Sequence, residues 1–149
     1  MGDRAVLDGP SALTGLRSVC HYELRRPRQL VAVGLEFDEG ELLVEVDPDL
    51  DEVALSFGVG LTGPVPSHWP EATRRPVTDA AGYRDLRGLD SAWRWVLWNQ
   101  QGYCDAFQIE LGPAGATTTL QYLAVAGALE CRRVVPGSPS GGFSGWLGR

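Results

Sequence analysis

The chain has 149 residues, a net charge of −6, 44% hydrophobic residues and 13 basic residues, all of them arginine. This length and composition predict one globular domain that buries about 70% of its unfolded surface, and they exclude a chain that is disordered throughout. The acidic balance argues against nucleic acid as a ligand, and no apolar run approaches the ~18 residues that a membrane-spanning helix needs.

Four segments in the first half of the chain show the alternation of apolar and polar residues that is typical of β-strands. They run over residues 17–24, 29–37, 41–46 and 52–57. Short turns rich in Pro, Gly, Asp or Arg separate them, and their regular spacing predicts an antiparallel meander.

Residues 58–89 hold many glycines and prolines, which exclude long regular elements there. We expect an irregular and functional loop with a short helix in 69–75 or 79–86. Beyond it, the pattern predicts an aromatic hairpin and two more strands. These lie over residues 93–111, 117–125 and 130–135.

The combined pattern predicts a mainly β or α+β fold. We expect an antiparallel meander and hairpin sheet that is curved or closes into a partly open barrel. This domain covers residues 1–135, and the Gly/Ser/Pro-rich residues 136–149 predict a flexible tail.

The aromatic cluster over residues 93–111 predicts two strands joined by a tight turn. With Trp98 opposite Tyr103 across a loop over 99–102, the side chains separate onto two faces. One face would hold Arg94, Val96, Trp98, Tyr103, Asp105 and Phe107, and the other Trp93, Trp95, Leu97, Cys104, Ala106 and Gln108. The second face places tryptophans opposite small residues, so we expect it to pack into the core.

The first face admits two interpretations. Arg94 and Asp105 form a partly exposed ion pair that fixes the register, or they belong to an aromatic binding patch, since Trp, Tyr and Arg are enriched in interface hot spots. The loop amides either satisfy backbone groups or contact a ligand, and Gly102 is expected to have a positive φ. The candidate binding residues here are Arg94, Trp98, Asn99, Gln100, Gln101, Tyr103 and Asp105.

Residues 36–52 carry nine acidic residues and no basic one. Because these acids cluster at the turns around one predicted strand, we expect several of them to crowd one end or edge of the sheet. They form either a solvated edge that blocks intermolecular strand pairing or a docking surface that attracts a basic partner. The candidate docking residues are Asp38, Glu39, Asp47, Asp49 and Asp51.

Motifs for metal binding are absent. The chain has two histidines and no Cys-x-x-Cys or His-x-x-x-His, and the acidic run over 47–51 lacks the Gly and Glu that a calcium loop needs. Three widely spaced cysteines do not make a disulfide framework, and residues 1–10 lack the apolar core of a secretory signal. We therefore expect no metal or cofactor and a cytoplasmic location.

The run Trp-x-Leu-Trp-Asn-Gln-Gln-Gly-Tyr-x-Asp, over residues 95–105, resembles a signature of small bacterial domains of unknown function. The acidic single-domain chain is also similar to the immunity proteins of toxin systems. The resemblance brings no assigned activity, so no catalytic residue is carried over from it. The acidic stretch is what favours a basic protein as the partner, and a toxin that acts on nucleic acid is one such protein.

These features favour a non-catalytic, immunity-type protein whose acidic edge and aromatic hairpin cover the active site of a basic partner. A second hypothesis is a small-molecule or peptide-binding domain with a cleft under the 58–89 loop, lined by Trp69 and Trp98. A third is a thiol enzyme that uses Cys104 with His21 and Asp105, although alternation places Cys104 and Asp105 on opposite faces.

Overall fold

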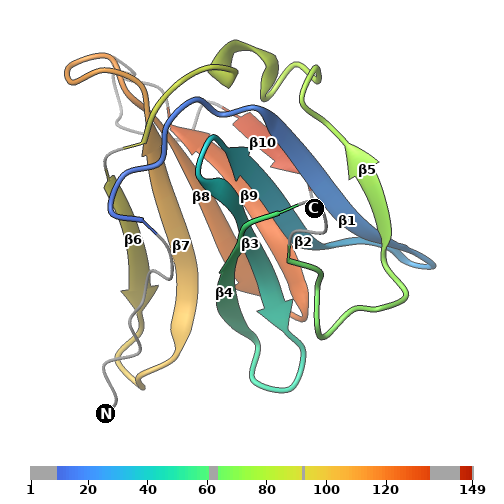
Figure 1. Cartoon of the computed structure of the whole chain (residues 1–149). Coiled ribbons are helices and arrows are strands. Elements are labelled where there is room, and N and C mark those ends of the chain that lie inside the picture. Colours follow the sequence, from blue (N-terminus) through green and yellow to red (C-terminus); the bar gives the residue numbers. More distant parts are fainter. Residues whose placement is uncertain (1–9, 61–63, 92, 135–144, 149) are drawn as a thin grey trace.

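Two five-stranded antiparallel sheets make up the fold (Figure 1). The computed structural model describes residues 10–60, 64–91 and 93–134, together with the backbone of residues 145–148. The predicted mainly β, antiparallel class is confirmed. The strands are divided between two packed sheets, and the described residues form no closed barrel.

The first sheet has the strand order β4-β3-β2-β1-β5. Its strands are β1 (Ser18–Arg25), β2 (Arg28–Phe37), β3 (Gly40–Asp47), β4 (Glu52–Gly58) and β5 (Thr73–Pro76). β1 to β4 follow one another across the sheet, which confirms the predicted meander. The β2–β3 turn requires glycine, because φ of Gly40 is 152° and a Cβ there would lie 2.5 Å from the carbonyl oxygen of Gly58.

The second sheet has the strand order β10-β9-β8-β7-β6. Its strands are β6 (Trp93–Trp98), β7 (Cys104–Leu111), β8 (Thr118–Val125), β9 (Ala128–Val134) and β10 (Gly145–Gly148). β10 pairs with β9, so residues 145–148 of the predicted tail add a fifth strand. The rest of that tail, residues 136–144 and 149, lies outside the described residues.

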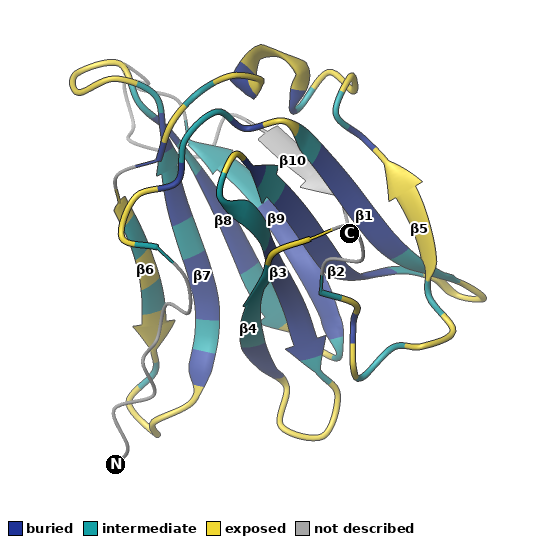
Figure 2. Cartoon of the chain, viewed as in Figure 1, coloured by how far each residue is buried: buried dark blue, intermediate teal, exposed yellow. Residues whose placement is uncertain are grey.

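The core lies between the two sheets. Val33 and Val44 of the first sheet belong to the same buried cluster as Phe107, Ile109 and Leu120 of the second, and all five are 0% exposed. Figure 2 shows this burial along the strands of both sheets, with the exposed residues concentrated in turns, in β5 and in β6. Burial of large apolar side chains from both sheets supplies the dominant stabilisation of such a fold.

The long connection between β4 and β6 contains a 3₁₀ turn, η1 (Arg84–Leu86), within the predicted window 79–86. The alternative helix over 69–75 is wrong, because β5 begins at Thr73 and pairs with β1. The segment before β5 is held against the first sheet by Trp69, whose indole N–H donates to the carbonyl oxygen of Val46 at 2.7 Å. No helix in the described ranges is long and apolar enough to cross a membrane.

Candidate functional site

The aromatic hairpin forms where it was predicted, with its register shifted by two residues. Val96 lies opposite Phe107, and a bulge then places Trp98 opposite Cys104. The predicted pairing of Trp98 with Tyr103 is therefore wrong. As far as Leu97 the shift is an even number, so the residues paired there keep the two predicted faces, but the bulge moves Cys104 to the face of Trp98, against the prediction.

The orientation of these two faces is the reverse of the prediction. Phe107 and Ile109 point toward the first sheet, so Val96 and Arg94, which lie opposite them, are on the inner face. The outer face of β6 exposes its large apolar residues to solvent. These are Trp93 at 63%, Trp95 at 41% and Leu97 at 39% exposure. The residues of β7 that point inward are large and apolar. Burying them stabilises the fold more than burying the β6 tryptophans would.

Arg94 and Asp105 do not form the ion pair of the first interpretation. The register places Arg94 opposite Ile109. Its Nη2 donates to the carbonyl oxygen of Pro10, and burial lowers its pKa. Asp105 accepts a hydrogen bond from the side-chain amide of Asn99 at 3.2 Å. Arg94 therefore lies apart from the other candidates, whereas Asp105 stays beside the hairpin loop.

The hairpin loop is organised by Asn99. Its Oδ1 accepts hydrogen bonds from the backbone N–H of Gln101 at 2.9 Å and of Tyr103 at 3.1 Å. This amide satisfies backbone groups, in agreement with one predicted alternative, while Gln100 and Gln101 are exposed. Gly102 has a φ of 86°, which confirms the predicted positive value.

The acidic segment is divided between the two ends of β3. Asp38 and Glu39 lie at the β2–β3 turn, whereas Asp47, Asp49 and Asp51 lie at or beside the β3–β4 turn. Successive turns of an antiparallel meander lie at opposite ends of the strand between them. Asp47, Asp49 and Asp51 therefore gather at one end of the sheet, whereas Asp38 and Glu39 lie at the other end.

Asp38 and Glu39 make internal contacts. Asp38 Oδ1 accepts a hydrogen bond from Arg17 Nε at 2.8 Å, and Glu39 accepts one from the backbone N–H of Thr14 at 2.6 Å. The hydrogen bonds from Thr14 lower the pKa of Glu39. These two acids hold the residues before β1 against the β2–β3 turn, away from the aromatic hairpin loop.

Three turns from the two sheets meet at the other end of the molecule. The carboxylate of Asp51 accepts hydrogen bonds from the backbone N–H of Ala126 at 3.2 Å and of Gly127 at 2.8 Å. Glu52 Oε1 accepts one from the backbone N–H of Cys104 at 3.2 Å. The β3–β4, β6–β7 and β8–β9 turns are thus tied together, as Figure 1 shows at the lower end of the molecule.

We call this surface the turn face and define it as residues 47–51, 98–105 and 125–127. It exposes large apolar side chains beside carboxylates. The exposed apolar residues are Leu50 at 50%, Trp98 at 47%, Tyr103 at 43% and Val125 at 36%. The carboxylates are Asp47, Asp49, Asp51 and Asp105. None of the three segments contains an arginine, so the turn face combines aromatic surface with uncompensated negative charge.

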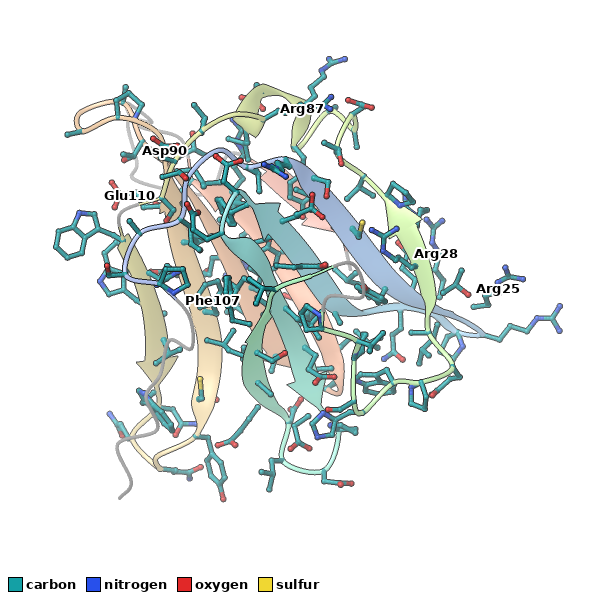
Figure 3. All side chains as sticks on the ribbon, viewed as in Figure 1. Arg25, Arg28, Arg87, Asp90, Phe107 and Glu110 are labelled. Carbon is teal, nitrogen blue, oxygen red and sulfur yellow. The ribbon has the colours of Figure 1, made fainter. Side chains whose placement is uncertain are left out.

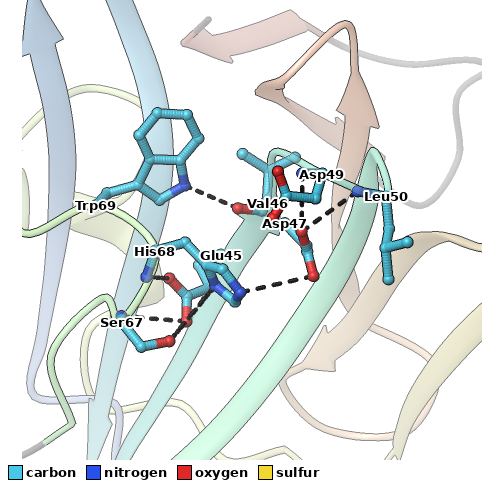
Figure 4. A network of polar contacts seen from close by, with 8 residues as sticks. All are labelled: Glu45, Val46, Asp47, Asp49, Leu50, Ser67, His68 and Trp69. Atoms are coloured by element: carbon cyan, nitrogen blue, oxygen red, sulfur yellow. Dashed lines mark hydrogen bonds and ion pairs between the residues drawn. The ribbon is translucent and has the colours of Figure 1, made fainter.

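Beside the turn face, a polar network fixes the segment that follows β4 (Figure 4). Glu45 is 5% exposed and accepts hydrogen bonds from Ser67 Oγ at 3.0 Å and from the backbone N–H of Ser67 and His68. The His68 ring lies between Glu45 at 3.4 Å and Asp47 at 3.5 Å. His68 Nδ1 also lies 3.4 Å from Ser67 Oγ, so the two side chains and the two carboxylates form one connected network.

The sequence offered no signal for this network, because Glu45 and Ser67 are 22 residues apart and the segment between β4 and β5 has no periodic pattern. Among the described residues, no group of three or more His, Cys, Asp or Glu side chains is arranged to hold a metal ion.

The residues of the thiol-enzyme hypothesis are not brought together. His21 is 2% exposed, and its Nε2 lies 2.9 Å from the hydroxyl of Tyr83. Desolvation, with a smaller effect of Arg75, lowers the pKa of His21 to about 4. Cys104 is buried in the other sheet, where its Sγ contacts the carbonyl oxygen of Ala106.

The two tryptophans of the cleft hypothesis also lie on different parts of the fold. Trp69 packs against the first sheet and donates to Val46, whereas Trp98 ends the edge strand of the second sheet.

The model of a family of unknown function, DUF6334, matches residues 11–138. No curated protein matches the chain, and no solved structure does so either.

Proposed function

The chain belongs to DUF6334, a family of unknown function, and we propose that it is a non-catalytic interaction domain that binds a basic protein through its turn face. The observation that carries this proposal is the meeting of exposed aromatic residues and carboxylates on one surface. Trp98 and Tyr103 come from one sheet, and Asp47 and Asp49 come from the other.

The aromatic part of the turn face supplies contact area. Trp98 and Tyr103 are each more than two-fifths exposed and flank a loop whose backbone is fixed by Asn99. Large, pre-ordered aromatic side chains are typical anchors of protein interfaces, because little conformational entropy is lost when they are covered. Their ring faces also attract Lys and Arg side chains.

The charged part of the turn face selects the partner. Its carboxylates lie within a surface that carries no arginine, whereas Arg25 and Arg28 lie at the tip of the β1–β2 hairpin, on the other side of the molecule from β6 (Figure 3). Such segregation produces a negative potential over the turn face, which attracts cationic partners and accelerates their association.

In its specific form, the proposal is an immunity-type role. A toxin that acts on nucleic acid has a basic cleft, because the cleft must attract phosphate groups. A negative surface with aromatic anchors is complementary to such a cleft, and it would inhibit the toxin by covering it.

An arginine-rich peptide and its glutamate counterpart test the proposal by isothermal titration calorimetry. We expect the protein to bind the arginine peptide only. The affinity should fall when the salt concentration is raised to the physiological level, where the Debye length is about 8 Å and charge interactions are screened. Trp98→Ala should weaken binding about 30-fold, as expected for a hot-spot residue, and Asp49→Asn should weaken it about threefold, as expected for an exposed charge.

The matched control is Asp38→Asn, which removes the same charge at the opposite end of β3 and should leave the affinity unchanged. Equal affinities for both peptides, or equal effects of Asp38→Asn and Asp49→Asn, would contradict the proposal.

A further inference from the structure

His68 connects the segment after β4 to the turn face. Its Nδ1 lies 3.4 Å from Glu45 Oε1, and its Nε2 lies 3.5 Å from Asp47 Oδ2. Glu45 and Asp47 are two residues apart on β3, so their side chains leave the strand on the same face. Both ring nitrogens therefore face carboxylates, one of which is buried in the fold while the other belongs to the turn face (Figure 4).

The two forms of the His68 ring fit this arrangement differently. A neutral imidazole carries one N–H, so one of its nitrogens directs a lone pair at a carboxylate. An imidazolium carries an N–H on both nitrogens and can interact favourably with Glu45 and Asp47 at the same time. Histidine is the side chain that changes its charge between about pH 5 and pH 8. A change of pH in this range therefore alters the interaction of the ring with both carboxylates.

The second carboxylate oxygen of Asp47 connects this interaction to the turn. Asp47 Oδ1 accepts hydrogen bonds from the backbone N–H of Asp49 at 2.9 Å and of Leu50 at 3.3 Å. Asp49 and Leu50 are exposed residues of the turn face. One carboxylate thus contacts the imidazole on one side and the backbone of the β3–β4 turn on the other.

We propose that His68 regulates the turn face, and that the charging of its imidazole at mildly acidic pH releases a basic partner. Because the turn face is the proposed binding site, this regulation rests on the proposed function. An imidazolium beside Asp47 compensates one of the four carboxylates of the turn face, so the negative potential that attracts the partner becomes weaker. By linkage, a bound partner disfavours the protonated ring, so binding in this pH range releases protons to the buffer.

The surroundings of the ring assign this pH range to His68. Among the described residues, Glu45 and Asp47 are the charged groups paired with His68, and both come from β3. Aspartate and glutamate ordinarily change their charge near pH ~4, below the range for histidine. The other histidine of the chain, His21, is buried, and desolvation lowers its pKa to about 4. His21 therefore stays neutral in the range in which the partner is released.

Isothermal titration calorimetry with the arginine-rich peptide at about pH 8 and about pH 5.5 tests this release. We expect the wild type to bind about threefold more weakly at the lower pH, which is the effect of one exposed charge. His68→Gln keeps a neutral polar side chain, so it should bind equally at both pH values, with the affinity of the wild type at the higher pH. His21→Gln is the matched control, because it removes the other histidine and should keep the threefold change.

A measurement without the peptide separates this inference from the proposed function. In an NMR titration over the same pH range, the amide signals of Asp49 and Leu50 should shift in the wild type and stay constant in His68→Gln. Equal shifts in the two proteins would overturn the inference, and so would a wild-type affinity that does not change with pH. If the peptide binds at neither pH while the shifts still depend on His68, the proposed function and the release are contradicted, whereas the coupling of His68 to the turn stands.

Discussion

The carboxylate of Asp51 accepts a hydrogen bond from the backbone N–H of Gly127 at 2.8 Å. Asp51 belongs to the β3–β4 turn of the first sheet, and Gly127 belongs to the β8–β9 turn of the second. The same carboxylate also accepts from the N–H of Ala126. A single side chain thus joins the two sheets at the turn face and sets the positions of its acidic and aromatic parts.

Replacing this side chain should destabilise the fold. Asp51 has a φ of 52°, a conformation that Asp and Asn tolerate better than Ala does. Asp51→Ala loses both hydrogen bonds and adds backbone strain, so we expect a loss of about 2 kcal/mol in the free energy of unfolding. Asp51→Asn keeps one acceptor and the tolerated conformation and should lose about half as much. Urea unfolding measures both, with Asp49→Ala as the control of nearly wild-type stability.

A substitution at Ala126 should increase the stability of the fold, in contrast to those at Asp51. Ala126 and Gly127 are the two residues between β8 and β9, and both have positive φ, at 51° and 78°. This is the pattern of a type I′ hairpin turn, for which Asn-Gly is preferred. Ala126→Asn should therefore stabilise the protein by about 1 kcal/mol, because the strain of alanine in this conformation is relieved. A thermal midpoint equal to or below that of the wild type would contradict this explanation.

The buried His21 makes stability depend on pH. Its pKa is about 4 in the folded protein, against 6.5 when solvated, because burial disfavours the charged form. Between these two values the unfolded state binds more protons than the folded state. The contribution of His21 is therefore fully present above pH 6.5 and is lost as the pH falls through 4, for a total of about 3 kcal/mol.

His21→Gln tests this contribution, since glutamine stays neutral and can still accept from Tyr83. The difference in free energy of unfolding between wild type and variant should shrink by about 3 kcal/mol from pH 7 to below pH 4. Tyr83→Phe is the control, because it removes the hydrogen-bonding partner and leaves the imidazole to titrate. A difference that stays constant with pH would show that His21 does not cause the acid sensitivity.

The local patterns of the sequence were sufficient for eight strands, whereas β5 and β10, which are four residues long, were missed. The alternation through β2 and β3 predicted the meander. The separation of the hairpin side chains onto two faces survived an error in register as far as Leu97, and the bulge then moved Cys104 to the other face. The sequence also contained enough information to predict which face of β6 points toward the core. Phe107, Ile109 and Leu111 form an apolar row on β7 that is fully buried, and such a row identifies the core side better than the bulk of the tryptophans does.

Only part of the arrangement of the turn face could be predicted from the sequence. The division of the acids between two ends follows from the meander itself, because its turns alternate in position. The approach of the β6–β7 and β8–β9 turns to the β3–β4 turn does not follow, since it depends on how two separate sheets pack. No local pattern encodes the contacts of Asp51 with Gly127 or of Glu52 with Cys104, which span 76 and 52 residues.

Glu45 should control the order of the segment after β4. Its buried carboxylate accepts from Ser67 Oγ and from two backbone N–H groups. Glu45→Gln replaces one acceptor oxygen with a donor, so hydrogen exchange of the Ser67 and His68 amides should accelerate about tenfold. Asp79→Asn serves as the control, since the side chain of Asp79 is 88% exposed. Unchanged exchange in Glu45→Gln would mean that Trp69 alone holds the segment.

The three cysteines provide a test of the thiol-enzyme hypothesis. Cys20, Cys104 and Cys131 are 2%, 5% and 0% exposed, and burial raises the pKa of Cys20 and Cys131. Because the thiolate is the reactive species, we expect an aromatic disulfide reagent to modify none of them in the native protein and all three after unfolding. Rapid native reaction of Cys104 at neutral pH, absent in Cys104→Ser, would instead support the thiol-enzyme hypothesis, because only a low pKa and access from solvent allow it.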